Sequence, residues 1–457
     1  MKNGKFEVAF YTFYDHTTME THFEKMAAKG WALDRMGIFW HYRRIEPAKL
    51  RYAVGYFPGG GIYGPVSEGE MTFEDYCAEA GWNLTAEHGE IKVFCNANED
   101  PVPLETQADI QVENIREASE RAVFIRAAAA LIGWVGILWF LASAVFDSVK
   151  TLSSGLGCTW AVLFLCLGIS STDELITYYR WYKRAKANAD RDQSFTPTWS
   201  HRGVQGAALT ASLAVLAVWA VTVGETGRLA LLIFGTIWGL YYLTDLIRTR
   251  MRRRGLPTAA NIAVNFTVVA VVTAGVITGY FHFTDQDSVN GRQYYDHNGF
   301  RWSQEEDVLP LALAELKEGA APLEGELYTK TYNTQQSLLL SRLSAEESGV
   351  YESSEDREPE EYYMQYIVAK VHLDLLYDYT LHSMLRTYAG EEAWTATEEW
   401  ELPDGTAGRA YQLSYERQEQ RICRYVICMQ DRVVKMDLSF EPDAEQRARM
   451  TEKLAEI

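Results

Sequence analysis

The feature that most constrains this chain is a series of long apolar runs between Ala122 and Phe283. Five segments there hold about 20 mostly apolar residues each, the length that a bilayer core requires of a helix. They are residues 127–146, 156–176, 204–223, 229–247 and 260–283. Backbone polar groups find no water in lipid, so such runs must be helical. A buried core helix is the alternative for any single run, but five in tandem predict a multi-pass α-helical membrane protein.

Lysine and arginine gather in two of the loops between these segments, and this predicts an orientation. The loops after the second and the fourth segment are strongly basic, whereas the other two short loops hold one basic residue each. Basic short loops stay on the cytoplasmic side of a membrane. With five spans in residues 111–283, we expect residues 1–110 to form a cytoplasmic domain and residues 284–457 an extracellular one. The basic residues of the two loops are Arg180, Lys183, Arg184, Lys186, Arg191, Arg202, Arg248, Arg250, Arg252, Arg253 and Arg254.

Charge divides unevenly along the chain and limits the kinds of partner. Residues 284–457 contain 35 acidic against 17 basic residues, and residues 1–121 contain 20 against 12. The segment between them has 14 basic against 7 acidic residues, which suits loops beside an anionic membrane surface. The acidic flanks argue against a nucleic-acid partner. We therefore expect the lipid bilayer of the cell membrane to be the main partner.

The N-terminal domain is predicted to contain two copies of one strand–helix–strand–strand module. The dipeptides Gly30-Trp31 and Gly81-Trp82 stand at the same junction of each copy, where a helix ends on glycine. Alternating apolar residues precede and follow these helices, as in half-buried strands. We expect an α+β domain with one antiparallel sheet and both helices on one face. The predicted strands are residues 6–12, 31–36, 38–44, 50–57, 82–87 and 91–96.

The two helices of this domain are predicted from their starts and their apolar faces. Thr17-x-x-Glu20 fits a capping box, in which the two side chains satisfy backbone N–H groups at a helix start. The second helix is expected over residues 72–80. This tandem architecture resembles the small-molecule effector-binding domains of bacterial regulators, and the resemblance implies a ligand- or partner-binding module.

Aromatic residues are frequent in the N-terminal domain and supply its candidate ligand-binding site. An aromatic-lined groove is one interpretation, and a core with cross-strand aromatic pairs is the other. The candidate ligand-binding residues are Trp31, Trp40, Tyr42, Tyr56 and Trp82.

Three stretches of the N-terminal quarter carry a more specific resemblance. They read HFEKMAAKGWALDRMGIFWHYRRIEPAKLRYAVGYFP, TFEDYCAEAGW and NEDPVPLETQADIQVENI. The chain resembles an uncharacterised bacterial membrane-protein family, a domain of unknown function. The resemblance implies a genomic neighbour, because members are often encoded beside PadR-like transcriptional regulators. It implies no chemistry.

Catalytic motifs are not evident. Residues 59–64 fit GxGxxG, but Pro65 follows and the expected sheet is antiparallel, so a loop is favoured over a dinucleotide site. The sequence contains no HExxH, GxSxG or zinc-type Cys/His spacing. We expect no enzymatic activity, no metal site and no cofactor.

Three carboxylates near the inner ends of the second and fourth spans form a second candidate site, for an ion or a proton. They are Asp173, Glu174 and Asp245. Carboxylates within a membrane are unfavourable and often functional. The alternative is a structural ion pair at helical spacing, with Arg180 or Arg248 as the partner.

The C-terminal region after Phe283 is predicted to be an α+β domain. Helices are expected over residues 307–318, 362–388 and 444–457, and strands over residues 394–401, 410–416, 421–430 and 433–440. Cys423 and Cys428 lie in one predicted strand at an odd separation, which places their side chains on opposite faces. Two free thiols are therefore expected.

Two functions are compatible with these features. The first is a sensory or signalling membrane protein that couples an extracellular domain to a cytoplasmic ligand- or partner-binding module, in association with a PadR-like regulator system or another membrane protein. The alternative is a transporter or a transporter accessory subunit. Few polar residues lie deep in the spans, which favours signalling.

Overall fold

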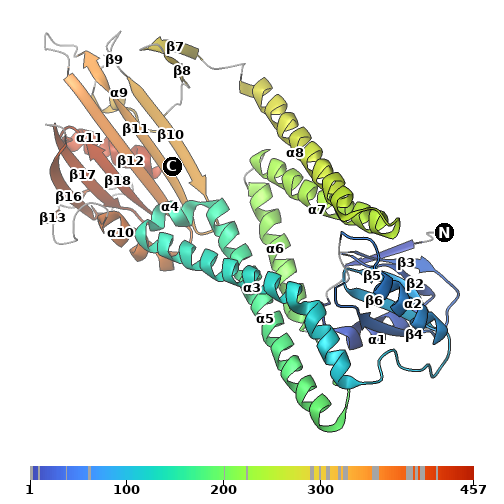
Figure 1. Ribbon diagram of the computed structural model, residues 1–457. Helices are drawn as coiled ribbons and strands as arrows, with labels where there is room; N and C mark the ends of the chain where they lie inside the picture. Colours follow the sequence, from blue (N-terminus) through green and yellow to red (C-terminus); the bar gives the residue numbers. More distant parts are fainter. Residues whose placement is uncertain are drawn as a thin grey trace. The chain divides into compact units, whose positions relative to one another are not determined.

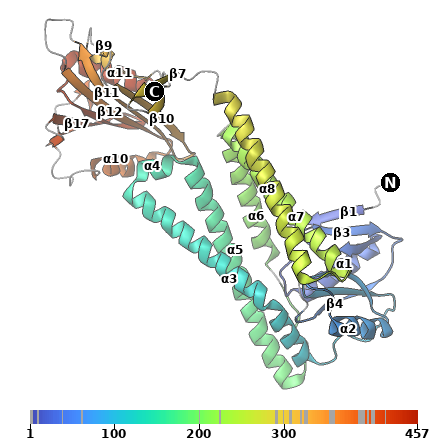
Figure 2. The ribbon, with the colours of Figure 1, turned by 45° about the horizontal axis from the view of Figure 1, so that its top comes forward.

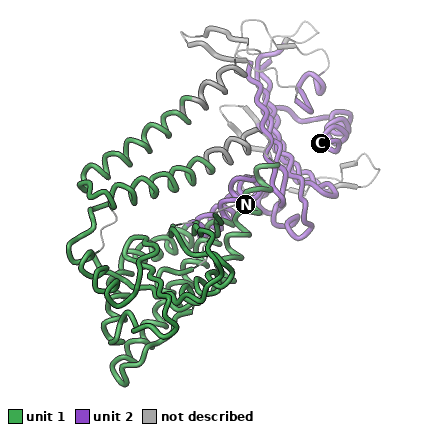
Figure 3. Tube along the Cα trace, turned by 90° about the vertical axis from the view of Figure 1, so that its right-hand side faces the viewer, with its two compact units in different colours: residues 1–135, 162–287 green, residues 136–161, 288–457 purple. Residues whose placement is uncertain are grey.

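The computed structural model describes residues 4–8, 11–37, 39–59, 63–199, 201–222, 225–288, 293–297, 300–304, 309–317, 321–322, 328–352, 360–386, 395–396, 400–401, 407–417 and 420–457. The chain divides into two compact units (Figure 3). Unit 1 comprises residues 1–135 and 162–287, and unit 2 comprises residues 136–161 and 288–457.

Unit 1 begins with two modules of the same topology (Figure 1). The last strand of each module lies in the middle of a three-stranded antiparallel sheet, in the orders β1-β3-β2 and β4-β6-β5. The identical order is what a duplication requires. The first module contains β1 (Gly4–Val8), α1 (His16–Ala28), β2 (Trp31–Arg35) and β3 (Phe39–Arg44), and the second contains β4 (Arg51–Tyr56), α2 (Glu68–Glu79), β5 (Asn83–His88) and β6 (Ile91–Asn96).

The two modules share local geometry as well as topology. Gly30 and Gly81 end their helices at φ +82° and +87°, a left-handed conformation that glycine adopts without steric penalty. Four residues after each glycine, at Asp34 and Thr85, the strand pairing shifts by one residue, as at a β-bulge. The duplication therefore extends to an irregularity that no apolar pattern encodes.

The expectation of a single antiparallel sheet was wrong, since the described strands form two separate three-stranded sheets. β2 and β5 lie against each other at the junction of the modules. Both strands carry the bulge, and a bulge bends and twists the strand that contains it. The edges that would have to join are therefore distorted in both modules.

The predicted capping box at Thr17 and Glu20 was also wrong. Helix α1 begins at His16, one residue before the predicted cap. The Thr17 hydroxyl accepts a hydrogen bond from the backbone N–H of Thr198 (3.1 Å), and Glu20 accepts one from Val54 N–H (2.9 Å). Both side chains are used for tertiary contacts instead of for the helix start.

Long helices follow the two modules. They are α3 (Ala108–Phe146), the short α4 (Ser148–Ser153), α5 (Gly155–Asp192), α6 (Arg202–Thr222), α7 (Glu225–Arg253) and α8 (Thr258–Ser288). Among the described residues, four helices are long and apolar enough to cross a membrane, namely α3, α5, α6 and α8. The predicted fourth span falls on α7, and the side chains of its first residues, Glu225–Phe234, lie outside the described ones.

Helices α3 and α5 come into close contact at two glycines. A Cβ atom added to Gly133 would lie 2.4 Å from the backbone nitrogen of Gly168. No side chain fits in such a space, so the backbones of the two helices touch here. Small residues allow close helix packing in membranes for this reason. Beside the contact, Trp134 Nε1 donates a hydrogen bond to Thr172 Oγ1 (2.9 Å).

Unit 2 is built on an antiparallel sheet of eight strands. Its order is β10-β11-β12-β18-β17-β16-β13, with β9 paired to β11. The strands are β9 (Ala321–Pro322), β10 (Thr329–Gln336), β11 (Leu340–Glu352), β12 (Glu360–Val371), β13 (Thr395–Ala396), β16 (Ala410–Arg417), β17 (Gln420–Cys428) and β18 (Arg432–Leu438). Two small ladders join β7 (Gln293–His297) to β8 (Phe300–Gln304) and β14 (Trp400–Glu401) to β15 (Ala407–Gly408).

Helices cover both faces of this sheet. On one face, α9 (Leu313–Leu316) and α11 (Ala444–Ala455) pack over a core that includes Cys423, Tyr425 and Ile427 of β17. On the other, α4, the end of α3 and α10 (Tyr377–Arg386) pack over Val426 and Val433. Helices α4 and α10 lie side by side there (Figure 2).

The sequence predicted part of unit 2 correctly. The strands expected at residues 410–416, 421–430 and 433–440 correspond to β16, β17 and β18, and the last helix corresponds to α11. The helix expected over residues 362–388 was wrong, because Tyr362–Val371 belongs to strand β12 and the helix α10 starts only at Tyr377. The helix expected over residues 307–318 is reduced to α9, and Asp307, Val308 and Glu318 lie outside the described residues.

Candidate functional site

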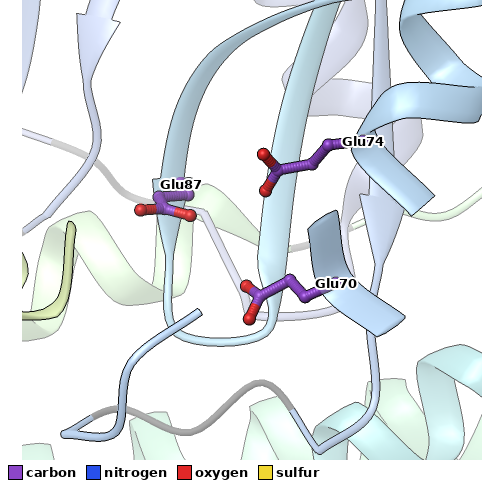
Figure 4. A group of neighbouring side chains, drawn as sticks. All are labelled: Glu70, Glu74 and Glu87. Atoms are coloured by element: carbon purple, nitrogen blue, oxygen red, sulfur yellow. The ribbon is translucent and has the colours of Figure 1, made fainter. Parts of the chain in front are cut away.

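A cluster of charged side chains is buried where the second module of unit 1 meets the end of α7. Glu70 and Glu74 come from α2, Glu87 from β5 and Lys92 from β6, while Arg252 comes from the last turn of α7. The three carboxylates converge (Figure 4). With Arg253, these residues form what we name the buried charge cluster.

Lys92 lies at the centre of the buried charge cluster. Its side chain is 0% exposed, and its Nζ lies 2.8 Å from Glu70 Oε1 and 3.4 Å from Glu87 Oε2, with Glu74 also in contact. Burial alone would raise the pKa of Glu70, but hydrogen bonds from Lys92 and Arg252 lower it below its ordinary value. Burial alone would likewise lower the pKa of Lys92, but hydrogen bonds to Glu70 and Glu74 raise it. Glu70 and Lys92 thus hold each other in the ionised form.

The same cluster fastens α7 to the second module. Arg252 pairs with Glu70 and lies 3.7 Å from Glu87, and Arg253 Nε lies 3.1 Å from Glu87 Oε1. Arg252 is 4% exposed. A buried ion pair is strongly destabilising to break, because the remaining charge is left without a partner. The basic end of α7 is therefore attached to the N-terminal domain by its charges.

The three carboxylates have oxygens within 4.8 Å of one another, a spacing that could suit a metal ion. Hard cations prefer such oxygen ligands. Here, however, the ammonium of Lys92 and the guanidinium of Arg252 already lie among the same oxygens. Three acidic and three basic groups balance in the buried charge cluster. The arrangement is therefore that of a salt-bridge network.

The loop between α5 and α6 contacts the first module. Thr198 and Thr17 exchange two hydrogen bonds of 3.1 Å, each backbone N–H donating to the other hydroxyl. Arg202 lies over the ring of Tyr11, 4.0 Å from its centre. Trp181 is fully buried within unit 1, next to Tyr14. Both basic loops therefore pack against the N-terminal domain, one on each module.

The intramembrane carboxylates predicted from the sequence each have a partner. Asp245 pairs with Arg248, as expected, and lies 3.9 Å from His88. Asp173 pairs with His201 (2.8 Å). The pairing expected between Asp173 and Arg180 is replaced by this contact, because the loop after α5 brings His201 back to the helix.

Glu174, beside Asp173, is more buried than the other two carboxylates. Its side chain is 2% exposed, and its Oε2 lies 2.9 Å from Arg126 Nε of α3. Its other oxygen, Oε1, has no hydrogen-bond partner within the described part of the chain. These contacts favour structural ion pairs, with Glu174 the least satisfied of the three.

The candidate ligand-binding aromatics lie mainly in cores. Trp40, Tyr42, Tyr56 and Trp82 are each less than 5% exposed. Trp31 is half-buried, with the guanidinium of Arg44 4.9 Å from its ring centre. Trp40, Tyr42 and Tyr56 belong to the core beneath α1. Trp82 belongs to a smaller core with Cys77 and Phe94. This burial favours the packing interpretation over an aromatic-lined groove.

Sequence reasoning missed the buried charge cluster. Its members are separated by up to 183 positions, and none belongs to a recognised spacing. One weak signal was available: Lys92 interrupts the apolar strand Ile91–Asn96, where a lysine needs an acidic partner if it points inward. Residues 60–62 of the glycine-rich loop lie outside the described residues.

Among the described residues, four helices long and apolar enough to cross a membrane accompany small N-terminal antiparallel sheets and a C-terminal sheet, and this combination favours insertion into a membrane. Residues 15–126 match the family model described as "Protein of unknown function (DUF2812)". The match runs from the start of α1 into α3 and thus includes most of both modules. No curated protein and no solved structure matches the chain.

Proposed function

We propose that this protein is a membrane-embedded signalling protein, in which α3 and α5 couple the C-terminal domain to the N-terminal one. The observation that carries the proposal is the length of these helices, 39 and 38 residues. A bilayer core requires only about 20 residues. The remaining turns extend into folded domains.

Each end of α3 belongs to a hydrophobic core. Val112 and Ile115, near its start, are buried with α1 in unit 1. Ala144, in its last turn, is buried with α4 and α10 in unit 2. Helix α5 contributes Tyr178, Trp181 and Ala185 to the core of unit 1. A helix built into a core at both ends transmits a displacement better than a flexible tether does, since packed cores do not deform continuously.

The proposal includes an orientation and a fifth span. Helix α7 would cross the membrane with the other four, which puts both basic loops on the cytoplasmic side. Both loops pack on the N-terminal domain, which supports a cytoplasmic location for it. The C-terminal domain would then lie outside the cell.

The experiment enlarges the side chain at the end of α3 that lies in the core of unit 2. Ala144→Trp should displace the last turn of α3, because Ala144 is only 9% exposed. Ala142→Trp is the matched control, since Ala142 is exposed on the same helix two residues away. Hydrogen exchange is then measured in nanodiscs over residues 108–118 and 178–185.

We expect Ala144→Trp to change exchange in these two segments and Ala142→Trp to leave it unaltered. Thermal unfolding and gel filtration identify variants that remain folded. A folded Ala144→Trp protein with the exchange pattern of Ala142→Trp would show that no coupling runs along α3.

A partner is proposed on the family resemblance stated for the sequence. The N-terminal domain would act on a PadR-like regulator system or on another membrane protein. Purification from the native membrane, followed by mass spectrometry, identifies such a partner. Enrichment that disappears when Lys92→Met disrupts the second module would assign the contact to this domain.

The alternative function, transport, is favoured by one observation: buried Glu174 Oε1 has no hydrogen-bond partner among the residues that the structure describes. Glu174→Gln and Asp245→Asn separate the two functions. If these carboxylates are structural, both variants lose modest stability and keep the exchange response to Ala144→Trp. Proton or cation flux in liposomes that either substitution abolishes would favour transport.

A further inference from the structure

Three leucines of the C-terminal domain project from its surface. Leu338 is 70% exposed, Leu373 49% and Leu375 91%. Single exposed leucines are ordinary, but a contiguous apolar patch marks an interaction surface. These three belong to two connections, the turn from β10 to β11 and the link from β12 through η1 (Asp374–Leu376) to α10.

Hydrogen bonds hold the two connections together. The backbone N–H of His372 donates to the carbonyl of Leu339 (3.1 Å), and its ring Nδ1 lies 3.4 Å from the carbonyl of Leu338. His372 directly precedes Leu373. The leucines therefore lie at one end of the domain, and we name Leu338, Leu373 and Leu375 the leucine rim.

The leucine rim lies at the end of the domain that contacts α4 and the last turn of α3. Ser337, next to Leu338, donates its hydroxyl to the carbonyl of Leu152 in α4 (2.5 Å). Tyr379, one turn after Leu375, donates to the carbonyl of Ala144 in the last turn of α3 (2.8 Å). Helices α4 and α10 lie side by side at this end (Figure 2). The rim is thus tied to the point where α3 ends.

The surface of α3 that leads to this point is apolar and uncovered within unit 2. Trp139 is 76% exposed, Val145 65% and Phe146 88%. In a membrane-spanning helix such side chains face lipid, and aromatic residues gather near the headgroups. The lipid-facing surface of α3 therefore continues to the level of the leucine rim.

We propose that the leucine rim is a lipid-binding surface, seated in the bilayer leaflet in which α3 ends. Asp374 and Asp378 are exposed beside the leucines, and charged side chains stay out of the acyl chains. The leucines would therefore insert only to the boundary of headgroups and acyl chains. Apolar side chains of interfacial segments enter about 5–10 Å into this boundary. The C-terminal domain would then rest on the membrane in addition to being attached to α3 and α4.

The test places the photo-crosslinking residue benzoylphenylalanine at one position of the full chain at a time. Leu338 and Leu375 probe the rim, and Glu452, exposed on α11, is the control position. Each protein is reconstituted in phosphatidylcholine vesicles and illuminated, and the adducts are identified by mass spectrometry. Two rim positions guard against one variant that fails to fold.

We expect lipid adducts at both rim positions, in at least about tenfold excess over Glu452, because a side chain seated in the boundary is surrounded by lipid. Adducts between two copies of the chain at Leu338 and Leu375 would overturn the proposal and assign the rim to an interface between copies. Equal lipid labelling at Leu375 and Glu452 would overturn it as well. The outcome is independent of signalling, because it concerns only where the domain rests.

Discussion

Lys92→Met tests the buried charge cluster most directly. Methionine keeps most of the volume of lysine but removes the charge that three carboxylates share. Lys92 is 0% exposed, and without its ammonium Glu70 and Glu87 keep the arginines of α7 while Glu74 loses its ion pair. Removing one partner of a buried ion pair costs about 3–5 kcal/mol. The cluster lies in unit 1, residues 1–135 and 162–287, and for a unit of that size the loss lowers Tm by at least about 6 °C.

The assay is thermal unfolding of the purified protein, followed by hydrogen exchange in β5 and β6. Lys49→Met is the matched control, because the pair of Lys49 and Glu99 (3.9 Å) is 90% and 85% exposed. Exposed pairs contribute below about 1 kcal/mol, so this variant should unfold almost like the parent. Equal Tm values for the two variants would refute the reasoning.

The pH dependence of Lys92→Met provides a second check. The hydrogen bond from Lys92 lowers the pKa of Glu70 against the effect of burial, so the substitution removes part of that lowering. A carboxyl group whose folded-state pKa rises loses stability as the pH increases, so we expect a smaller loss of stability at pH 5 than at pH 8. A loss that is the same at both pH values would mean that the lysine acts only through its packing.

Three further predictions concern orientation, pH and thiols. A reporter fused after Arg254 should be active only in the cytoplasm, and one fused at Ile457 only outside the cell; a cytoplasmic signal at Ile457 would mean that the number of spans is not five. Burial raises the pKa of Glu20 to about 7 from an ordinary value of 4.5, so its contribution to stability is complete below pH 4.5 and is lost as the pH rises to 7. Glu20→Gln should therefore raise the free energy of unfolding at pH 8 by up to about 3 kcal/mol, with a higher Tm, and leave both unchanged at pH 4.5. A Tm gain that is equal at both pH values would contradict the assignment. Thiol counting on the unreduced protein should find Cys423 and Cys428 free, since the strand β17 holds them on opposite faces; a bond between them would disprove that strand.

Local signals predicted the N-terminal modules well. A glycine that ends a helix must adopt a left-handed conformation, and this requirement is visible at Gly30 and Gly81 in the sequence itself. The strands around each helix follow from alternation. By contrast, the capping box at Thr17 and Glu20 is equally compatible with tertiary contacts, and only the fold decides that these side chains bind Thr198 and Val54.

The error at residues 362–388 has the same physical origin. The run from Tyr362 to Val371 is rich in aromatic and β-branched residues, which suit a strand, yet it leads without a turn signal into a true helix. What makes it a strand is its position in the centre of the sheet, between β11 and β18. Likewise, the buried charge cluster requires Lys92 and Arg252, which are far apart in the sequence, to pair with the same carboxylate, Glu70. No local pattern encodes that arrangement.

The contact of Gly133 with Gly168 divides α3 into two arms of unequal length. At about 1.5 Å per residue, the arm from Gly133 to Val112 is roughly 32 Å long and the arm to Ala144 roughly 17 Å. A rigid rod that tilts about this point moves its ends in opposite directions, in a ratio of about two to one. Under such a tilt, an ångström of displacement at the C-terminal end of α3 becomes about two ångströms among the buried side chains beneath α1. Spin labels at both ends of α3 would detect the opposite movements. Gly168→Leu forces the two helices apart at this contact, so the two-to-one ratio of the displacements should disappear.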